Sequence, residues 1–256
     1  MINTKELKSF LDEKADQYNN IDFIGDDPIQ MPHRFSLRQD IEIVAFLVAT
    51  ISWGNRKSII RSAEKILEIM GNSPYEFIMN YSENDLKSIQ EKSIHRTFNG
   101  QDFIYFIKQF NKIYRKNTSL EELFILNDSE INFYHAIERF RNQFLDIEKH
   151  RSHKHVSSPY KNSSAKRIIM FLRWMVRKDK RGVDFGIWKN IDQKYLSIPL
   201  DVHTGNISRK LGLISRTQND WKTVEELDVV IRKFDKEDPA KYDFALFGLG
   251  VTKEWV

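Results

Sequence analysis

The run IEIVAFLVATISW, residues 41–53, restricts the possible folds more than any other stretch of the chain. Its side chains are apolar almost all round a helix, and Glu42 is its single charged residue. A helix that is apolar on every side is buried inside a bundle, and this run is too short to span a bilayer. It therefore predicts a helix at the centre of a helical bundle, in a chain that does not enter a membrane.

Amphipathic helices are the commonest pattern in the rest of the sequence. Residues 56–70, RKSIIRSAEKILEIM, place apolar side chains at helical spacing, and residues 102–114 and 131–145 repeat the pattern. Alternating strand-like runs are absent, and an Asn-Gly hairpin pair occurs once, at residues 99–100. We therefore expect an all-α protein of about ten helices. Irregular structure is expected at 22–38, 148–163 and 178–199.

Capping patterns mark several helix starts. Ser73-Pro74-Tyr75-Glu76 combines a capping box with proline at the first helical position. Ser119 with Glu122, and Thr223 with Glu226, show the same spacing. The pattern predicts helices that begin near these serine and threonine residues.

Composition excludes several classes of chemistry. The chain has no cysteine, which excludes disulfides, thiolate catalysis, zinc sites built on cysteine and iron–sulfur clusters. Hydrophobic residues make up 41% of it, enough to predict a folded chain rather than a disordered one. The N-terminal sequence MINTKELKSFLDEK has no apolar signal core, so we expect a cytoplasmic protein.

Chain length bounds the domain organisation. The 256 residues suffice for one large domain or for two lobes that share a core. No internal repeat or low-complexity linker divides them. We expect residues 1–256 to form a single two-lobed helical unit with a cleft between the lobes.

Positive charge is concentrated in residues 149–181. This segment holds eleven lysines and arginines against one acid, Asp179, a net charge of +10. The whole chain carries +4, which leaves −6 for the remainder. A basic block on a mildly acidic chain is typical of a polyanion-binding protein; a solvated basic loop is the alternative.

Within this block, NSSAKRIIMFLRWMVR (residues 162–177) predicts an amphipathic helix. An apolar stripe follows one side, and Lys166, Arg173 and Arg177 fall within about 20° of one another on a different face. Ser163 and Ser164 are candidate caps, and such a helix start can take a phosphate. The pattern predicts a row of three cations beside the core, with a solvated face that binds no phosphate as the alternative.

A second helix start lies in IPLDVHTGNISRKLGL, residues 198–213. Pro199 keeps the preceding residue extended, and Asp201 then stands where it can cap a helix over 202–212. From spacing alone, Asp201 is either a structural cap or a carboxylate held at a helix start for catalysis.

His203 follows Asp201 by two residues and shares a helical face with Ile207 and Leu211. This spacing predicts a buried, hydrogen-bonded histidine. Asp201 and His203 have no third ligand at a useful spacing, so we expect no metal site.

This same segment, IPLDVHTGNISRKLGL, resembles the one that defines the helix-hairpin-helix GPD superfamily of DNA glycosylases, where an Asp after Pro or Val precedes a helix. DIEIVAFLVATISWGNRKSIIRSAEKIL is similar to the helix and turn that open their catalytic fold. DWKTVEELDVVIRKFDKEDPAKYDFALFGLGV resembles their closing helices. The likeness covers residues 40–70 and 160–251.

The phrases RWMVRKDKRGVDFGIW and KYDFALFGLGV are typical of a bacterial family catalogued as a domain of unknown function. That second likeness extends over nearly the whole chain.

The sequence departs from the glycosylase pattern in two ways. The Gly-rich hairpin of the superfamily is absent, and so are the cysteines that bind a cluster in some members. Archaeal 8-oxoguanine DNA glycosylases are the more similar template, because their hairpin is also atypical and a lysine opening an apolar helix precedes their Asp. Lys166 fits that position. The resemblance implies an all-α, two-lobed bundle of the HhH-GPD type with an atypical hairpin.

The activity implied by the resemblance is a DNA N-glycosylase that excises a damaged base, such as an oxidised purine, with or without AP-lyase activity. Asp201 would stabilise the positive charge that builds on the sugar, and Lys166 would attack that sugar. The base would be flipped out of double-stranded DNA into a pocket. The candidate pocket residues are Trp53, Gly54, Trp174, Trp188 and Tyr242. The candidate DNA-binding residues are Lys161, Arg167, Arg173, Arg177, Lys178, Lys180, Arg181 and Arg209.

Two other functions fit the same sequence. A catalytically silent nucleic-acid-binding protein could use the same fold, since fold does not fix function. An all-α interaction protein could bind an acidic partner through the basic segment. Product formation on damaged DNA separates the first alternative from the glycosylase, and a steep salt dependence of DNA binding separates both from the second. In each case we expect a monomer with no metal and no cofactor.

Overall fold

The computed structural model describes residues 4–146 and 150–252, so Lys149 of the basic segment lies outside the described residues. The chain divides into two compact units. The first unit comprises Met1–Phe23, Leu126–His135 and Ser158–Val256, and the second comprises Ile24–Ile125 and Ala136–Ser157.

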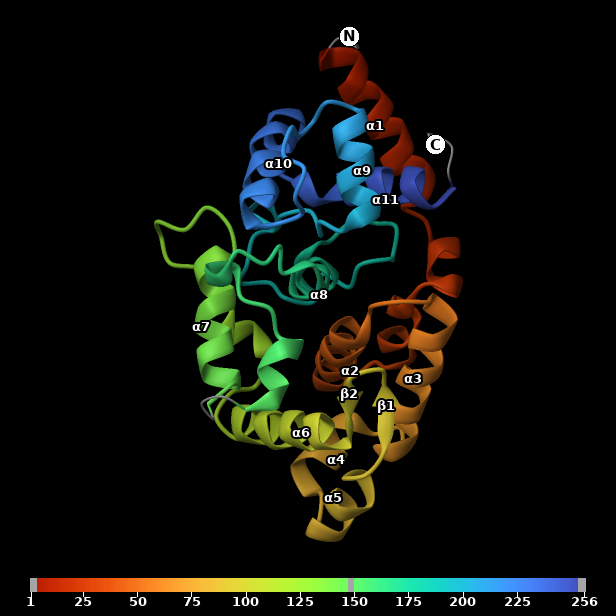
Figure 1. Cartoon of the computed structure of the whole chain (residues 1–256), viewed down its shortest axis with the longest axis vertical. Coiled ribbons are helices and arrows are strands. Elements are labelled where there is room, and N and C mark those ends of the chain that lie inside the picture. Colours follow the sequence, from red (N-terminus) through yellow and green to blue (C-terminus); the bar gives the residue numbers. More distant parts are fainter. Residues whose placement is uncertain (1–3, 147–149, 253–256) are drawn as a thin grey trace. The chain divides into compact units, whose positions relative to one another are not determined.

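The described residues form eleven α-helices and one two-stranded hairpin, which confirms the all-α prediction (Figure 1). Short 3-10 helices occupy much of the stretches predicted to be irregular. Those in the predicted stretches are Ile21–Asp26, Pro28–Gln30, Pro32–Arg34, Arg151–His155, Pro159–Lys161 and Gln193–Tyr195; Leu120–Leu123 and Pro239–Lys241 lie outside them. No helix within the described ranges is both long enough and apolar enough to cross a membrane.

The first unit is built from five helices. They are α1 (Thr4–Tyr18), α8 (Lys166–Val176), α9 (Val202–Lys210), α10 (Trp221–Phe234) and α11 (Tyr242–Thr252). Helix α11 packs against both α1 and α9 (Figure 1). Gly248 makes the contact with α1 close, because a Cβ at that position would lie 2.2 Å from Cδ2 of Tyr18. This packing fixes α9, whose cap is Asp201.

Helix starts follow the sequence signals in part. Pro74 is the first residue of α4 (Pro74–Asn80), although Ser73 makes no side-chain capping hydrogen bond. Ser119 caps a short 3-10 helix. The predicted start at Thr223 is wrong, because Asp220 caps α10 and accepts a hydrogen bond from the Thr223 N–H. An ionised carboxylate three residues upstream is a stronger acceptor than the hydroxyl.

The second unit contains six helices and the hairpin. They are α2 (Arg38–Ile51), α3 (Arg56–Ile69), α4, α5 (Glu83–Ile89), α6 (Gly100–Tyr114) and α7 (Tyr134–Phe144), with β1 (Ser93–His95) antiparallel to β2 (Phe98–Asn99). The first two residues of α7 are assigned to the first unit.

Helix α2 is the centre of the second unit, as its apolar sequence predicts. Every residue from Ile41 to Ile51 is buried. The Phe46 ring packs against four further phenylalanines, with centroid distances from 5.3 to 6.0 Å. They are Phe106 and Phe110 of α6, and Phe140 and Phe144 of α7. Aromatic rings at these separations add about 0.5–1.5 kcal/mol per pair beyond the area they bury.

Glu42 is the one charged residue in this buried stretch of α2, and its side chain is fully buried. Four donors satisfy its carboxylate: Arg38 Nε at 3.1 Å, Tyr114 Oη at 2.9 Å, the Leu120 N–H at 2.9 Å, and the Ser119 hydroxyl. These donors tie α2 to α6 and to the chain that follows α6. A buried charge that is fully hydrogen-bonded in this way specifies one arrangement of its neighbours.

We predict that Glu42→Leu lowers the free energy of unfolding by about 3–5 kcal/mol, because it leaves the buried donors without an acceptor. The exposed Glu68 of α3 offers a matched control; Glu68→Leu should change stability by less than about 0.5 kcal/mol. Urea denaturation of the three proteins measures both values. Equal stability of the two variants would contradict this role of Glu42.

Candidate functional site

Two side chains singled out by the sequence lie next to each other in the first unit. Lys166 is the first residue of α8, and Asp201 is the N-cap of α9. Lys166 Nζ lies 3.7 Å from Asp201 Oδ2, and the two side chains are 25% and 23% exposed. This distance exceeds that of a normal N–H···O hydrogen bond. The amine is therefore attracted to the carboxylate without being tightly bonded to it, and both side chains are partly exposed.

Hydrogen bonds to its side chain and to its backbone carbonyl hold Asp201 in place. Its Oδ1 accepts a hydrogen bond from the Thr204 N–H at 3.0 Å, which confirms the predicted cap and leaves Oδ2 for the lysine. Its carbonyl oxygen accepts from Asn219 Nδ2 at 3.0 Å, and Arg209 Nη2 in turn donates to Asn219 Oδ1 at 2.6 Å. Gly205 leaves room for this contact, since a Cβ there would lie 2.5 Å from Asn219 Oδ1.

The chain just before α8 adopts an unusual conformation. Ala165, the N-cap residue, has φ 49°, a left-handed value that costs a non-glycine residue about 1 kcal/mol. It has no side-chain cap, so the predicted capping role of Ser163 and Ser164 is wrong. The Ser164 hydroxyl instead donates to the Leu200 carbonyl at 3.2 Å. This bond ties the residues before α8 to those before α9 and so sets the position of the Lys166–Asp201 pair.

A second carboxyl lies beside the pair. Asp243, in the first turn of α11, is buried and accepts a hydrogen bond from Arg173 Nη1. Burial raises the pKa of Asp243 to about 6, because the attraction of Arg173 only partly offsets desolvation and the Asp201 carboxylate adds repulsion. The site therefore contains a carboxyl that can take up a proton under mildly acidic conditions.

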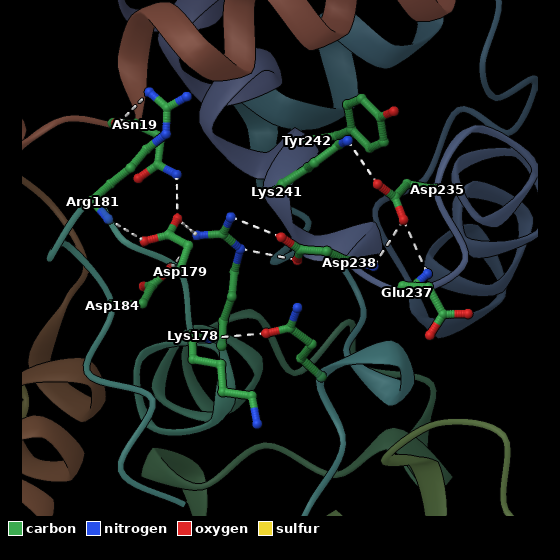
Figure 2. Close-up of polar contacts among 12 residues, drawn as sticks. Asn19, Lys178, Asp179, Arg181, Asp184, Asp235, Glu237, Asp238, Lys241 and Tyr242 are labelled. Atoms are coloured by element: carbon green, nitrogen blue, oxygen red, sulfur yellow. Dashed lines mark hydrogen bonds and ion pairs between the residues drawn. The ribbon is translucent and has the colours of Figure 1, made fainter.

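Arg173 and Arg177 are buried, with 5% and 2% of their surface exposed. Arg173 Nε lies 3.2 Å from Asp184 Oδ1, and Arg177 Nη1 lies 3.1 Å from Asp184 Oδ2. Arg177 also pairs with Asp179 and Asp238, each at 2.8 Å, among the carboxylates drawn in Figure 2. The predicted solvent-facing row of cations is therefore wrong for both arginines, because these carboxylates neutralise them inside the first unit.

Four of the predicted DNA-binding residues, Lys161, Lys178, Lys180 and Arg181, are exposed, as a phosphate contact requires. Arg167 is half-buried, and burial lowers its pKa to about 10. A partly buried guanidinium is a weaker candidate for binding a DNA backbone than these lysines.

Arg181 and Arg209 are engaged by other residues of the first unit. Arg181 pairs with the Asp16 carboxylate, and its Nη1 donates to the Asp16 carbonyl at 3.0 Å. Arg209 Nε donates to the Arg216 carbonyl at 2.6 Å. Arg209 thus helps to position Asp201 through Asn219, a role that differs from the predicted contact with DNA.

His203 is exposed, which corrects the prediction of a buried histidine. Its Cβ lies close to Gly250 of α11, where an added Cβ would be 3.0 Å away. The shared helical face with Ile207 did not decide burial: Val202 and His203 at the start of α9 are exposed, whereas Thr204, Gly205 and Ile207 are buried.

Three of the predicted pocket residues are core residues: Trp174 and Trp188 are 1% exposed and Tyr242 is 0% exposed. They are too buried in this structure to stack on an incoming base. The other two, Trp53 and Gly54, belong to the second unit. Trp53 is partly exposed and Gly54 is exposed.

Sequence reasoning missed Asp243 and Asn219. Asp243 carried a signal, since it is the one acid in the apolar run KYDFALFGLGV, and a lone acid in a buried helix must have a partner. Asn219 carried none, because only the folded loop brings its amide to the Asp201 carbonyl.

Residues 27–252 match a family described as "Protein of unknown function (DUF2400)", and the chain belongs to this family. No curated protein and no solved structure matches the chain. The family assignment agrees with the full-length likeness seen in the sequence, and the likeness to DNA glycosylases bears only on the function proposed below.

We predict that Arg177→Ala lowers the free energy of unfolding by about 3–5 kcal/mol, because it leaves buried carboxylates without a cation. Lys178→Ala, at the exposed next position, should change it by less than about 0.5 kcal/mol. Thermal and urea denaturation measure the difference. A mild effect of Arg177→Ala would contradict the ion-pair network.

We also predict a pH-dependent difference in stability between the wild type and Asp243→Asn. The folded protein binds a proton at Asp243 more tightly than the unfolded chain, whose value is near 3.8. The stability of the wild type relative to the variant should therefore fall as pH rises from about 4 to about 6, by up to about 3 kcal/mol, and then level off. Urea denaturation across this range measures it. Parallel curves for the two proteins would contradict the raised pKa.

Proposed function

We propose that this protein is a DNA N-glycosylase that removes a damaged base, with Asp201 and Lys166 as its catalytic residues. The observation that carries the proposal is the 3.7 Å approach of Lys166 Nζ to Asp201 Oδ2, with both side chains partly exposed. An amine and a carboxylate side by side at two helix starts are the groups that this reaction needs. The resemblance of the segment IPLDVHTGNISRKLGL to these enzymes supports the same reading.

Asp201 stabilises the positive charge that develops on the sugar as the base departs. Its cap hydrogen bond from the Thr204 N–H holds the carboxylate at the start of α9. The bond from Asn219 to its carbonyl keeps this charge in place without reorganisation during the reaction.

Lys166 acts as the nucleophile if the enzyme is bifunctional. Its neutral amine attacks C1′ of the sugar, and the bond to the base breaks with its electron pair leaving on the base. The added amine then loses one proton, and the C1′–O4′ bond breaks with its electron pair and that proton going to O4′, which leaves a protonated Schiff base between Nζ and C1′ of the opened sugar. In a monofunctional enzyme the same carboxylate would assist attack by water, and Lys166 would contact a phosphate.

DNA binding uses the exposed lysines of the basic segment rather than its buried arginines. Lys161, Lys178 and Lys180 are the exposed lysines among the predicted DNA-binding residues; Arg181 is also exposed but pairs with Asp16.

The test is borohydride trapping on duplex DNA that carries one modified base. Wild-type protein should form a covalent adduct, and Lys166→Gln should not. Asp201→Asn keeps a capping oxygen, so its stability should fall by about 1 kcal/mol or less, while its excision rate should fall by about 100-fold or more.

Two matched controls separate catalysis from structure. Lys222→Gln removes an exposed lysine of α10 to which no catalytic or DNA-binding role is assigned, and Asp220→Asn alters the equivalent cap on α10. Both should still trap. An adduct that persists in Lys166→Gln would move the nucleophile to another lysine, and excision at the wild-type rate by Asp201→Asn would overturn the catalytic assignment. DNA binding without any product would favour the catalytically silent protein.

A further inference from the structure

The hairpin of the second unit has an arginine at its turn. His95 of β1 pairs with Phe98 of β2, which leaves Arg96 and Thr97 as a two-residue loop. Such loops need a positive φ at their first residue and favour Gly or Asn there. Arg96 holds that position with φ 50°. The chain accepts a backbone conformation that is costly for arginine, which suggests that the side chain has a use.

The Arg96 side chain lies flat on Gly54. A Cβ placed on Gly54 would be 2.6, 2.7 and 3.0 Å from Nη2, Cζ and Nε of Arg96. These near-equal distances mean that the guanidinium lies over the position that a Cβ of Gly54 would take, and Arg96 is exposed. Gly54 itself has φ 100°, a value that only glycine adopts readily.

His95 fixes the hairpin to the turn that follows α2. Its Nε2 is 3.0 Å from the Trp53 carbonyl oxygen, and its Nδ1 is 3.0 Å from the Ser62 hydroxyl on α3. Both bonds are made by a side chain that is 3% exposed. Arg96 is therefore presented by a rigid support next to Trp53 and the start of α3.

The two chain segments that meet at Arg96 contain basic residues and no acidic ones. Residues 52–63 and 93–99 contribute Arg56, Lys57, Arg61 and Arg96 and no carboxylate. Lys57 and Arg61 are exposed, as is Arg96. The first acid that follows on α3 is Glu64, which is paired with Arg34. The three exposed cations Lys57, Arg61 and Arg96 are of the charge that binds a chain of phosphates.

We propose that Arg96, with Lys57 and Arg61, forms a binding site for the phosphate backbone of double-stranded DNA on the second unit. Arginine suits this role because its planar fork can donate two parallel hydrogen bonds to one phosphate. The site is separate in sequence from the basic segment 149–181. The inference rests on the proposed function, because duplex DNA is the substrate proposed for Lys166 and Asp201.

The experiment measures the affinity of each variant for an undamaged, fluorescein-labelled duplex by anisotropy over a range of salt. Arg96→Asn is the informative variant, because asparagine tolerates the positive φ and should leave the melting temperature unchanged or higher. Its dissociation constant should rise by about 5–10-fold, and the salt slope should flatten by about one unit. Arg96→Lys should lie between the two proteins.

Arg115→Asn is the matched control, an exposed arginine of the same unit at the end of α6 that bonds to Asn111. It should bind like the wild type. Wild-type affinity in Arg96→Asn, or an equal loss in Arg115→Asn, would overturn the proposal. Tighter binding of an RNA duplex than of DNA would overturn the choice of partner.

The outcome is separable from that of the proposed function. Arg96-dependent binding by a protein that releases no base would support this site and refute the glycosylase. Release of a base by a protein whose DNA affinity does not depend on Arg96 would support the glycosylase and refute this site. Failure of the wild type to bind duplex DNA at all would overturn this site, whatever the trapping experiment shows.

Discussion

The burial of Arg173 and Arg177 is the constraint on which the candidate site depends. Two guanidinium groups inside a protein are tolerated only when carboxylates pair with them. Asp184, Asp238 and Asp243 supply these carboxylates. Asn19 Nδ2 and the Arg181 N–H support the same network through Asp179 (Figure 2).

These ion pairs fix the last two turns of α8 against α11 and the loop after α8, and thereby fix where α8 begins. Lys166 stands at that beginning, and the Ser164–Leu200 bond holds the start of α9 beside it. The network thus links the stability of the first unit to the geometry of the Lys166–Asp201 pair. It also explains why the basic segment 149–181 is less basic at its surface than its sequence indicates.

The features that could be predicted from the sequence are those decided by nearby residues. The burial of α2 follows from its apolar period, and the cap at Asp201 follows from Pro199 and the helix after it. The features that could not be predicted depend on partners far away in the chain. Helical spacing placed Arg173 and Arg177 together on one face, but Asp243, 70 residues after Arg173, buries that face. The helical period shows which residues share a face of a helix, but it does not show which face a distant carboxylate will cover.

The central claim is that the Lys166–Asp201 pair cleaves the bond between a damaged base and its sugar. The most direct measurement is mass spectrometry of free bases released from a panel of duplexes, each with one modified base, by the wild-type protein in single-turnover conditions. The account predicts release of at least one modified base and none of the normal bases. No release from any duplex, by protein that binds each of them, would contradict it.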